Sequence, residues 1–198
     1  MSYARILGGL LLLGLLTTGA ARAQTKVFEM TVLGFKFGKM VVNRTLLPDS
    51  TELYTLHASG KATVLWIDFV SETKQEVRYK HGKLLSSSYT EIENGKLKRW
   101  TRVRLEGNIY RVESSKGVRS FTEAPSFSVA SIYFSDPSQV KQVFYEAEAN
   151  YAPVKYSKDR VEFTTSDGHR SVYYFRQGQL QKMEFHISIA VVYMERIA

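Results

Sequence analysis

Short runs in which apolar and polar residues alternate are the feature that most restricts how this chain of 198 residues can fold. One early run places Phe28, Met30 and Val32 on one face of an extended segment. Alternation with a period of two is typical of a β-strand with one buried face. The dipeptide Asn94-Gly95 separates two such runs, and both of its residues accept the positive φ angles of a tight hairpin turn. The pattern therefore predicts antiparallel hairpins.

The same pattern recurs along most of the chain, with turn residues between the runs. His81-Gly82 and the segment that begins at Pro48 are two further predicted turns. The longest run, 65–80, is predicted to bend or to form a bulge around Ser71, because single strands are seldom so long. We expect strands at 26–33, 40–46, 53–58, 65–80, 84–93, 97–105, 109–113, 118–121, 160–165, 171–176, 180–189 and 191–197.

One segment departs from the strand pattern. Phe127, Ala130 and Phe134 recur at intervals of three and four, which places them on one face of a helix. Ser126 or Ser128 is the expected N-cap, and the pair Asp136-Pro137 is the expected end of the helix. We expect one short helix at about 127–135, packed in the concave side of the sheet. Another irregular strand is the alternative.

Many strands joined by short turns, with little helix, indicate a mainly β protein built as an antiparallel up-and-down meander. A twisted sheet of about ten strands curls, closes, or splits into two packed sheets. We expect a closed or half-open barrel, with a two-sheet sandwich as the alternative. The sequence contains no linker and no convincing repeat, so residues 24–198 are predicted to form a single domain.

The first 23 residues have the organisation of a cleaved secretory signal. Arg5 supplies a positive charge, an apolar run extends from 6 to 16, and an Ala-Arg-Ala tripeptide ends at Ala23. The run is shorter than the roughly 20 apolar residues that a transmembrane helix needs, although an uncleaved amphipathic anchor is the alternative. We expect cleavage after Ala23 and export, either to the periplasm or out of the cell.

The sequence offers few groups for catalysis. The absence of Cys excludes disulfides, thiolate metal sites and a nucleophilic thiol. The four His lack the short spacings of a metal motif, and we expect neither a metal nor a cofactor. Asp136, Glu146 and Glu148 offer carboxylates, but their spacing alone does not define an acid–base pair. Enzymatic activity is not favoured. A hydrolase that uses His169 or His186 in a cleft is the alternative.

The chain carries a net charge of +8, and many of its basic residues lie between 96 and 119. Alternation along one predicted strand places Lys98, Trp100, Arg102 and Arg104 on the same face. This face is a candidate surface for an anionic component of the cell envelope, such as lipid headgroups or acidic glycans. Nucleic acid is not expected as a partner of an exported protein. The solvated outer face of a sheet has the same pattern and is the alternative.

Aromatic residues are concentrated in the second half of the chain. Such side chains bury large areas, so a packed core is one interpretation. The other is a partly open apolar cavity with Tyr hydroxyls at its mouth. The candidate lining residues are Phe127, Tyr133, Phe134, Phe144, Tyr145, Tyr173, Phe175 and Phe185.

Several short motifs follow one another along the chain: Gly34-x-x-x-Gly38 with Arg44, His81-Gly82-Lys83-Leu84, Asn94-Gly95-Lys96-Leu97, Ser131-Ile132-Tyr133-Phe134-Ser135-Asp136-Pro137, Val143-Phe144-Tyr145-Glu146, and Asp167-Gly168 before Tyr173-Tyr174-Phe175. In this order they resemble an uncharacterised family of exported bacterial β-rich proteins, a domain of unknown function. The resemblance covers nearly all of the chain after residue 23 and implies no catalytic residues. More loosely, a curled sheet over a short helix resembles the periplasmic lipoprotein carriers, whose half-barrels hold acyl chains in their hollow.

Export, the aromatic second half and these resemblances together predict a non-enzymatic binding protein for a lipid-like or other apolar ligand in the cell envelope. A scaffold or interaction module that acts through its outer surface is the alternative. A cavity of at least about 300 Å³ beneath residues 127–134 would favour ligand binding, whereas solid packing would favour the scaffold. No transmembrane segment is expected after cleavage, and the sequence does not predict the oligomeric state.

Overall fold

The computed structural model describes residues 22–64, 67–138, 140–187 and 190–198. In these residues 14 strands form one sheet, in the order β8-β7-β6-β5-β4-β3-β2-β1-β14-β13-β12-β11-β10-β9. The elements are β1 (Arg22–Val32), β2 (Phe35–Leu46), β3 (Thr51–Val64), β4 (Ile67–Lys80), β5 (Lys83–Glu93), β6 (Lys96–Glu106), β7 (Ile109–Ser114), β8 (Gly117–Phe121), α1 (Val129–Ile132), β9 (Gln142–Tyr145), β10 (Asn150–Ser157), β11 (Arg160–Thr164), β12 (Arg170–Arg176), β13 (Gln179–Ile187) and β14 (Ala190–Arg196).

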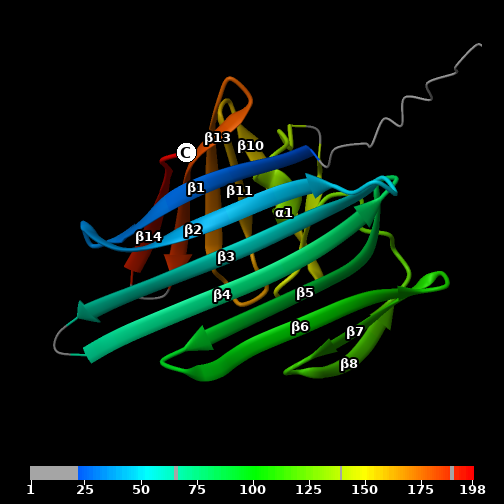
Figure 1. Ribbon diagram of the computed structural model, residues 1–198, viewed down its shortest axis with the longest axis horizontal. Helices are drawn as coiled ribbons and strands as arrows, with labels where there is room; N and C mark the ends of the chain where they lie inside the picture. The colour runs from blue at the N-terminus through cyan, green and yellow to red at the C-terminus, as the bar shows by residue number, and fades with distance from the viewer. Residues whose placement is uncertain (1–21, 65–66, 139, 188–189) are drawn as a thin grey trace, which may run out of the picture.

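The sheet curls so that its later strands run steeply behind the long early strands (Figure 1). Every described strand pair is antiparallel, and β1 pairs with β14 in the middle of the sheet, with Phe28 opposite Arg196. The two edge strands, β8 and β9, are not hydrogen-bonded to each other in the described sheet. The predicted mainly β meander is therefore confirmed in its half-open form. The sheet is neither a closed barrel nor two separate sheets.

Several of the predicted turns are formed by residues with positive φ angles. Asn94 and Gly95 have φ angles of 50° and 75°, and His81 and Gly82 have 50° and 72°. Two consecutive positive φ angles match the twist of the flanking antiparallel strands, which is why these dipeptides join strands so closely. The hairpins β4–β5 and β5–β6 are thus confirmed where the sequence placed them.

The bend or bulge predicted around Ser71 is wrong in its position. Strand β4 pairs with β5 without interruption from Ser71 to Arg78. The register shifts instead between Arg78 and Tyr79, where β5 contributes one extra residue, Leu85. A β-bulge of this kind increases the local twist of a strand. The alternation of polar and apolar residues does not reveal where the bulge lies, because the residues on either side of Leu85 do not mark the change of register.

Other strand boundaries also differ from the prediction. Strand β3 continues to Val64 and forms a long hairpin with β4, and β9 and β10 were not predicted at all. Strand β9 has only four residues, and β10 contains Pro153, which has no N–H to donate to a neighbouring strand. Short strands with weak alternation give little signal in a single sequence.

The helix is shorter than predicted. It spans only the four residues of α1, although all four are buried, as expected for a segment inside the concave side. Ser128 occupies the N-cap position, but its side chain makes no capping hydrogen bond. The helix packs against β3 and β9, so its predicted place inside the curl is confirmed.

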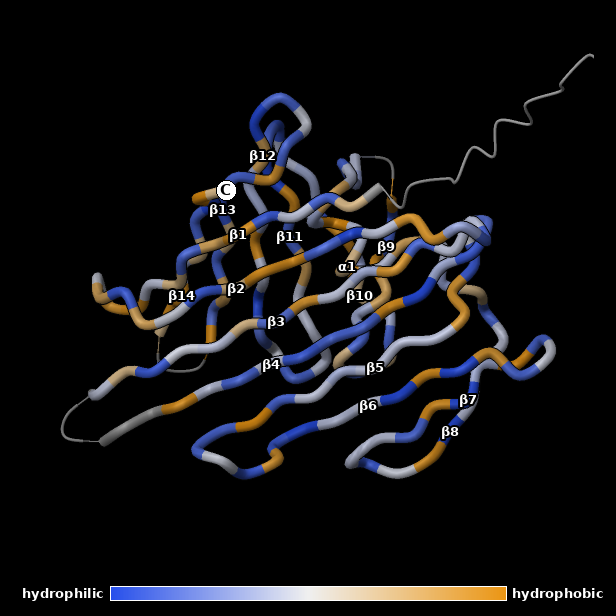
Figure 2. Tube along the Cα trace, viewed as in Figure 1, coloured by the Kyte–Doolittle hydropathy of each residue, from blue (hydrophilic) through white to orange (hydrophobic). Residues whose placement is uncertain are grey.

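The inner face of the sheet is apolar, and its residues form two clusters. One is built around Phe28, Met40 and Tyr173, and the other around Tyr110 and Phe144. Figure 2 shows the alternation of hydrophilic and hydrophobic positions along the strands that produces these clusters. Because side chains of a strand point alternately to its two faces, one face is buried and the other stays in solvent.

The predicted signal segment lies outside the described residues except for Arg22 and Ala23, which form the start of β1. Cleavage after Ala23 would remove these two residues from the strand. Among the residues that the structure describes, no helix is long and apolar enough to cross a membrane.

Two glycines, Gly38 and Gly60, allow β2 and β3 to pack closely, with the Phe37 ring against Gly60. Gly38 lies opposite Gly60, and a Cβ atom on Gly38 would stand 2.2 Å from the Ser59 carbonyl oxygen. A Cβ atom on Gly60 would stand 2.6 Å from the Phe37 ring. Any side chain at either position must therefore push backbone or a packed ring aside.

Gly38→Ala is expected to lower the free energy of unfolding by about 2 kcal/mol, because the added methyl group overpacks the β2–β3 contact. Urea denaturation monitored by Trp fluorescence would measure the change. Ser59→Ala, at an exposed neighbouring position, is the control and should alter stability little. Equal stabilities for the Gly38 variant and the parent would contradict the packing argument.

Candidate functional site

The concave side of the sheet is filled by residues 122–149, which follow the edge strand β8 and include the edge strand β9. The Phe144 N–H donates to the Phe127 carbonyl oxygen at 3.0 Å, which gives the edge of β9 a partner within this segment. The Thr101 hydroxyl on β6 donates to the Ala147 carbonyl oxygen at 2.7 Å. Together these bonds tie the segment to both halves of the sheet.

A buried lysine on β1 holds the end of α1. The Lys26 ammonium donates to the Tyr133 carbonyl oxygen at 2.7 Å and to Gln179 Oε1 at 3.2 Å. It also lies 5.5 Å from the centre of the Phe134 ring. Burial, together with the nearby positive charge of Arg196, lowers the pKa of Lys26. The charge is thus partly compensated by a helix-end carbonyl group and an aromatic face.

A buried carboxyl group holds the start of α1. Glu146, in the turn after β9, is only 1% exposed, and its Oε1 accepts a hydrogen bond from the Ala130 N–H at 3.1 Å. Burial raises the pKa of Glu146 to about 7, although the hydrogen bond from the Ala130 N–H opposes the rise. A desolvated carboxyl group favours its neutral form, so Glu146 titrates close to neutral pH.

Glu146 belongs to a cluster of buried polar groups that are incompletely paired. Within the described residues, Glu146 Oε2, Gln75 Nε2, Ser128 Oγ and the Tyr79 hydroxyl have no hydrogen-bond partner. Burial, and then the nearby Glu146 carboxyl, raise the pKa of Tyr79 far above its usual range. Unpaired polar groups are costly in a protein interior, so this cluster lowers the stability of the fold unless its groups find partners.

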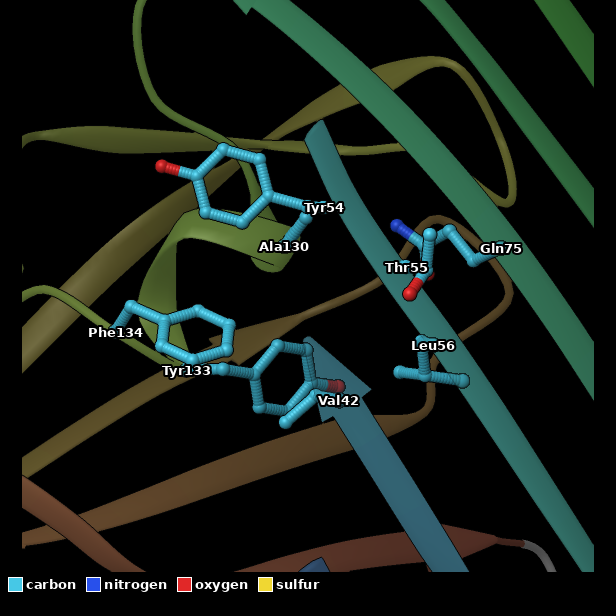
Figure 3. Close-up of a pocket in the computed structure, with 8 residues that line it drawn as sticks. All are labelled: Val42, Tyr54, Thr55, Leu56, Gln75, Ala130, Tyr133 and Phe134. Carbon is cyan, nitrogen blue, oxygen red and sulfur yellow. The ribbon is translucent and has the colours of Figure 1, made fainter. Parts of the chain in front are cut away.

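The predicted cavity residues lie together but are tightly packed. Tyr133 and Tyr173 are buried, and five of the other aromatic side chains pack against the same cluster; Phe144 belongs to the second cluster. The space beneath α1 measures about 10 Å³, enough for about one water molecule. Figure 3 shows the rings of Tyr54, Tyr133 and Phe134 on one side of this space, with Gln75 and Leu56 across from them. An apolar ligand inside the core would require these rings to move.

Larger recesses lie at the surface. A recess of about 180 Å³ beside α1 is polar and includes Arg44, Tyr54 and three serines. Another, of about 330 Å³, lies between β6–β8 and the turns after β9 and β11. A third, of about 400 Å³, lies at the β1–β2 hairpin and the end of β3 and is lined by Val32, Leu33, Phe35, Lys36, Phe37, Lys61, Ala62 and Thr63. This third recess, called the hairpin recess below, has the most apolar side chains.

The structure separates Lys98 from the other predicted anion-binding residues. The register of β5 with β6 shifts so that Lys98 is the extra residue of a bulge, and its ammonium pairs with Glu93. Trp100, Arg102 and Arg104 do share the outer face of β6, where the Arg102 guanidinium lies 5.7 Å from the centre of the Trp100 ring. The strict alternation expected for residues 96–104 is therefore wrong at its start, because the bulge resets which side chains face outward.

Three of the four histidines, including the two that the hydrolase alternative would use, lie beside a carboxylate. His57 Nε2 lies 2.9 Å from Glu72, and His169 Nδ1 lies 3.7 Å from Asp167. His186 lies 3.5 Å from Glu184. None of these rings lines the recesses described above. In the described part of the chain, no three His, Asp or Glu side chains are placed to hold a metal ion.

The three carboxylates singled out from the sequence have separate surroundings. Glu146 is buried, the Glu148 carboxylate accepts hydrogen bonds from the Ser166 N–H and hydroxyl, and Asp136 accepts one from the Ser138 N–H. Sequence reasoning missed the anchoring roles of Lys26 and Glu146. Lys26 lies at the start of an alternating strand, where a charged residue is ordinarily solvated, and only the fold reveals its burial.

Comparison with known proteins places this geometry in an uncharacterised group. Residues 28–197 match the family described as Domain of unknown function (DUF6134). A solved structure with a similar fold is a beta-barrel-like protein of domain of unknown function DUF1849 from Brucella abortus. It is 11% identical, the match covers 87% of this chain and 95% of that chain, and the TM-score is 0.58. At this identity the likeness concerns the fold alone. No curated protein matches the chain.

The raised pKa of Glu146 makes stability depend on pH. The unfolded chain loses this proton near pH 4.5 and the folded chain near pH 7, so between these values the folded state binds more protons. The free energy of unfolding is therefore expected to fall as pH rises through this window, by up to about 3 kcal/mol. Glu146→Gln removes the titration, so denaturation at pH 5 and pH 8 should show the variant gaining on the parent at the higher pH.

Glu106→Gln changes an exposed carboxylate and is the matched control; its stability should follow that of the parent at both pH values. Curves for Glu146→Gln and the parent that stay parallel from pH 5 to pH 8 would contradict the assignment of Glu146.

Proposed function

We propose that this protein, which belongs to the DUF6134 family of domains of unknown function, is an exported, non-enzymatic protein of the cell envelope that binds lipid-like or other apolar molecules. We place the binding site in the hairpin recess rather than in the aromatic core. The observation that carries this choice is the exposure of large apolar side chains at that recess.

Leu33 and Phe35, at the tip of the β1–β2 hairpin, are 65% and 75% exposed. Large apolar side chains that gather at the surface of a monomer commonly mark a binding site. Val32 on β1 lies opposite Val192 on β14, so the β13–β14 hairpin adjoins this tip, and its Ile187 is 41% exposed. The strand pair next to the β1–β2 hairpin therefore also exposes an apolar side chain.

Volume favours the recess over the core. The hairpin recess, at about 400 Å³, lies within the range of about 300–1,000 Å³ that small-molecule sites usually have. The enclosed space beneath α1, at about 10 Å³, does not. Lys36 and Lys61 border the recess, and a carboxylate or phosphate headgroup beside an acyl chain would find positive charge there. Lys36, itself exposed, pairs with the half-buried Glu29 at 2.9 Å and would exchange this partner for the headgroup.

A surface-acting scaffold is the second candidate, favoured by the packed interior of the curl. Both candidates are consistent with export through the predicted signal at residues 1–23. They differ in which surface matters, and the variants below separate them.

Titration with a dansylated fatty acid is expected to show saturable binding to the parent protein. Phe35→Ser removes the most exposed ring of the recess and should weaken binding about tenfold or more, because the lost burial of one aromatic side chain is of that size. Val118→Ser is the matched control, since Val118 is 67% exposed but lies outside the recess. Equal affinities for the two variants, or no binding by the parent, would contradict a ligand site at the recess.

Export is tested separately. Expression of the full chain in a bacterial host with fractionation is expected to yield a soluble exported species whose N-terminal residue is Gln24. Arg5→Glu reverses the charge of the n-region and should cause the uncleaved chain to accumulate in the cytoplasm. A chain that keeps its first residues and stays in the cytoplasm in the parent strain would rule out the signal.

A further inference from the structure

The outer face of the sheet carries a row of arginines that crosses four strands. Arg78 on β4 lies opposite Ser86 on β5, Ser86 lies opposite Arg104 on β6, and Arg104 lies opposite Arg111 on β7. Residues directly opposite in an antiparallel pair point to the same face. Strands stand about 4.8 Å apart, so the row from Arg78 to Arg111 extends about 14 Å. The residues Arg78, Ser86, Arg104 and Arg111 are called the arginine row below.

A second line of residues runs beside the arginine row. Glu76, Ser88, Arg102 and Glu113 lie opposite one another on the same four strands. Strands β4 and β6 show extended hydrophilic stretches here (Figure 2). All four arginines of the two lines are exposed, so their positive groups are in solvent.

The charges of this face are only partly balanced. Arg78 pairs with Glu76 at 2.9 Å, and Arg111 pairs with Glu113 at 3.0 Å, each along its own strand. In the part of the chain that the structure describes, Arg102 and Arg104 have no carboxylate within ion-pair distance. Four guanidinium groups therefore face two carboxylates.

The arrangement is unfavourable without a counter-charge. Arg104 and Arg111 stand directly opposite each other, and like charges in this position destabilise a sheet. Surface charges that keep a protein soluble usually mix both signs. Such a surface does not require two arginines directly opposite each other on neighbouring strands. An anion that bridges the row would remove the repulsion and use the fork-shaped donors of each guanidinium.

The size and chemistry of the face restrict the anion. A single small anion contacts one or two of these groups, whereas a row about 14 Å long matches a chain with repeated negative charges. Ser86 and Ser88 on β5 lie between the arginines of β4 and β6. Their hydroxyl groups can donate hydrogen bonds to, and accept them from, the hydroxyl groups of a sugar. The half-buried Trp100 ring flanks Arg102 and offers an apolar face to a pyranose ring.

We propose that the arginine row, with Arg102 and Trp100 beside it, binds a linear acidic polysaccharide laid across strands β4 to β7. This site is on the convex face of the sheet and is independent of the hairpin recess, so either can exist without the other. It replaces Lys98 of the predicted anion-binding face with Arg78 and Arg111.

The test is calorimetric titration of the full mature chain with alginate oligosaccharides of increasing length at low salt. Affinity is expected to rise with length until the oligosaccharide bridges the row, and to fall as NaCl is added. The double variant Arg102→Gln with Arg104→Gln should bind about tenfold or more weakly, the loss expected when charge-assisted hydrogen bonds disappear. The melting temperature of this double variant should equal that of the parent, which would show that the variant remains folded.

The matched control is Lys155→Gln with Lys158→Gln, which removes the same charge from exposed positions at the β10–β11 hairpin. An equal loss of affinity in this control would show that net charge alone drives binding and would overturn the proposal. Saturation by the monosaccharide, or no binding of any length, would overturn it as well. Phosphatidylglycerol vesicles and oligothymidylate form two further arms. Tighter binding of either, lost in the arginine variant, would reassign the face to a membrane or to nucleic acid.

Discussion

The apolar inner face of one continuous sheet has to be removed from water, and most of this structure follows from how that is achieved. Among the residues that the structure describes, no separate second layer covers the 14-stranded sheet, and the strands after α1 fold back over those before it. The two halves alone would leave a hollow between the edges β8 and β9. Residues 122–149 fill this hollow with aromatic rings, and the interior becomes solid.

The filling segment is held by polar groups as well as by apolar contacts. Lys26 binds the carbonyl group at one end of α1, and Glu146 binds an N–H group at the other. Each of these interactions requires a charged or polar group to be desolvated, so neither adds much to the free energy of unfolding. Their geometry instead fixes where the four-residue helix sits, because a purely apolar contact would tolerate small shifts of the segment. Fixing the position of α1 in this way leaves several buried polar groups around Glu146 without a hydrogen-bond partner, which lowers stability.

Much of the architecture was predictable because it depends on local chemistry. Alternating side chains and dipeptides such as Asn94-Gly95 act within a few residues, and they identified most strands and the antiparallel order. The features that were missed depend on contacts distant in sequence. The bulge at Lys98 is defined by the neighbouring strand, and the short strand β9 is defined by its pairing with β10 and by a bridge to Ser128. The burial of Lys26 requires Tyr133, which lies more than a hundred residues later. The space beneath α1 depends on how side chains interlock, which periodicity does not describe.

The pairing of β1 with β14 has a consequence for how the protein is made. Strands β1 to β8 can join hairpin by hairpin as they appear, but one side of β1 stays unpaired until Ala190–Arg196 has been synthesised. An unpaired strand edge in the middle of a growing sheet invites association with other chains. The native sheet is therefore complete only after β14 has paired with β1. Passage across a membrane in an unfolded state, as the proposed export requires, would deliver all the strands before that final pairing takes place.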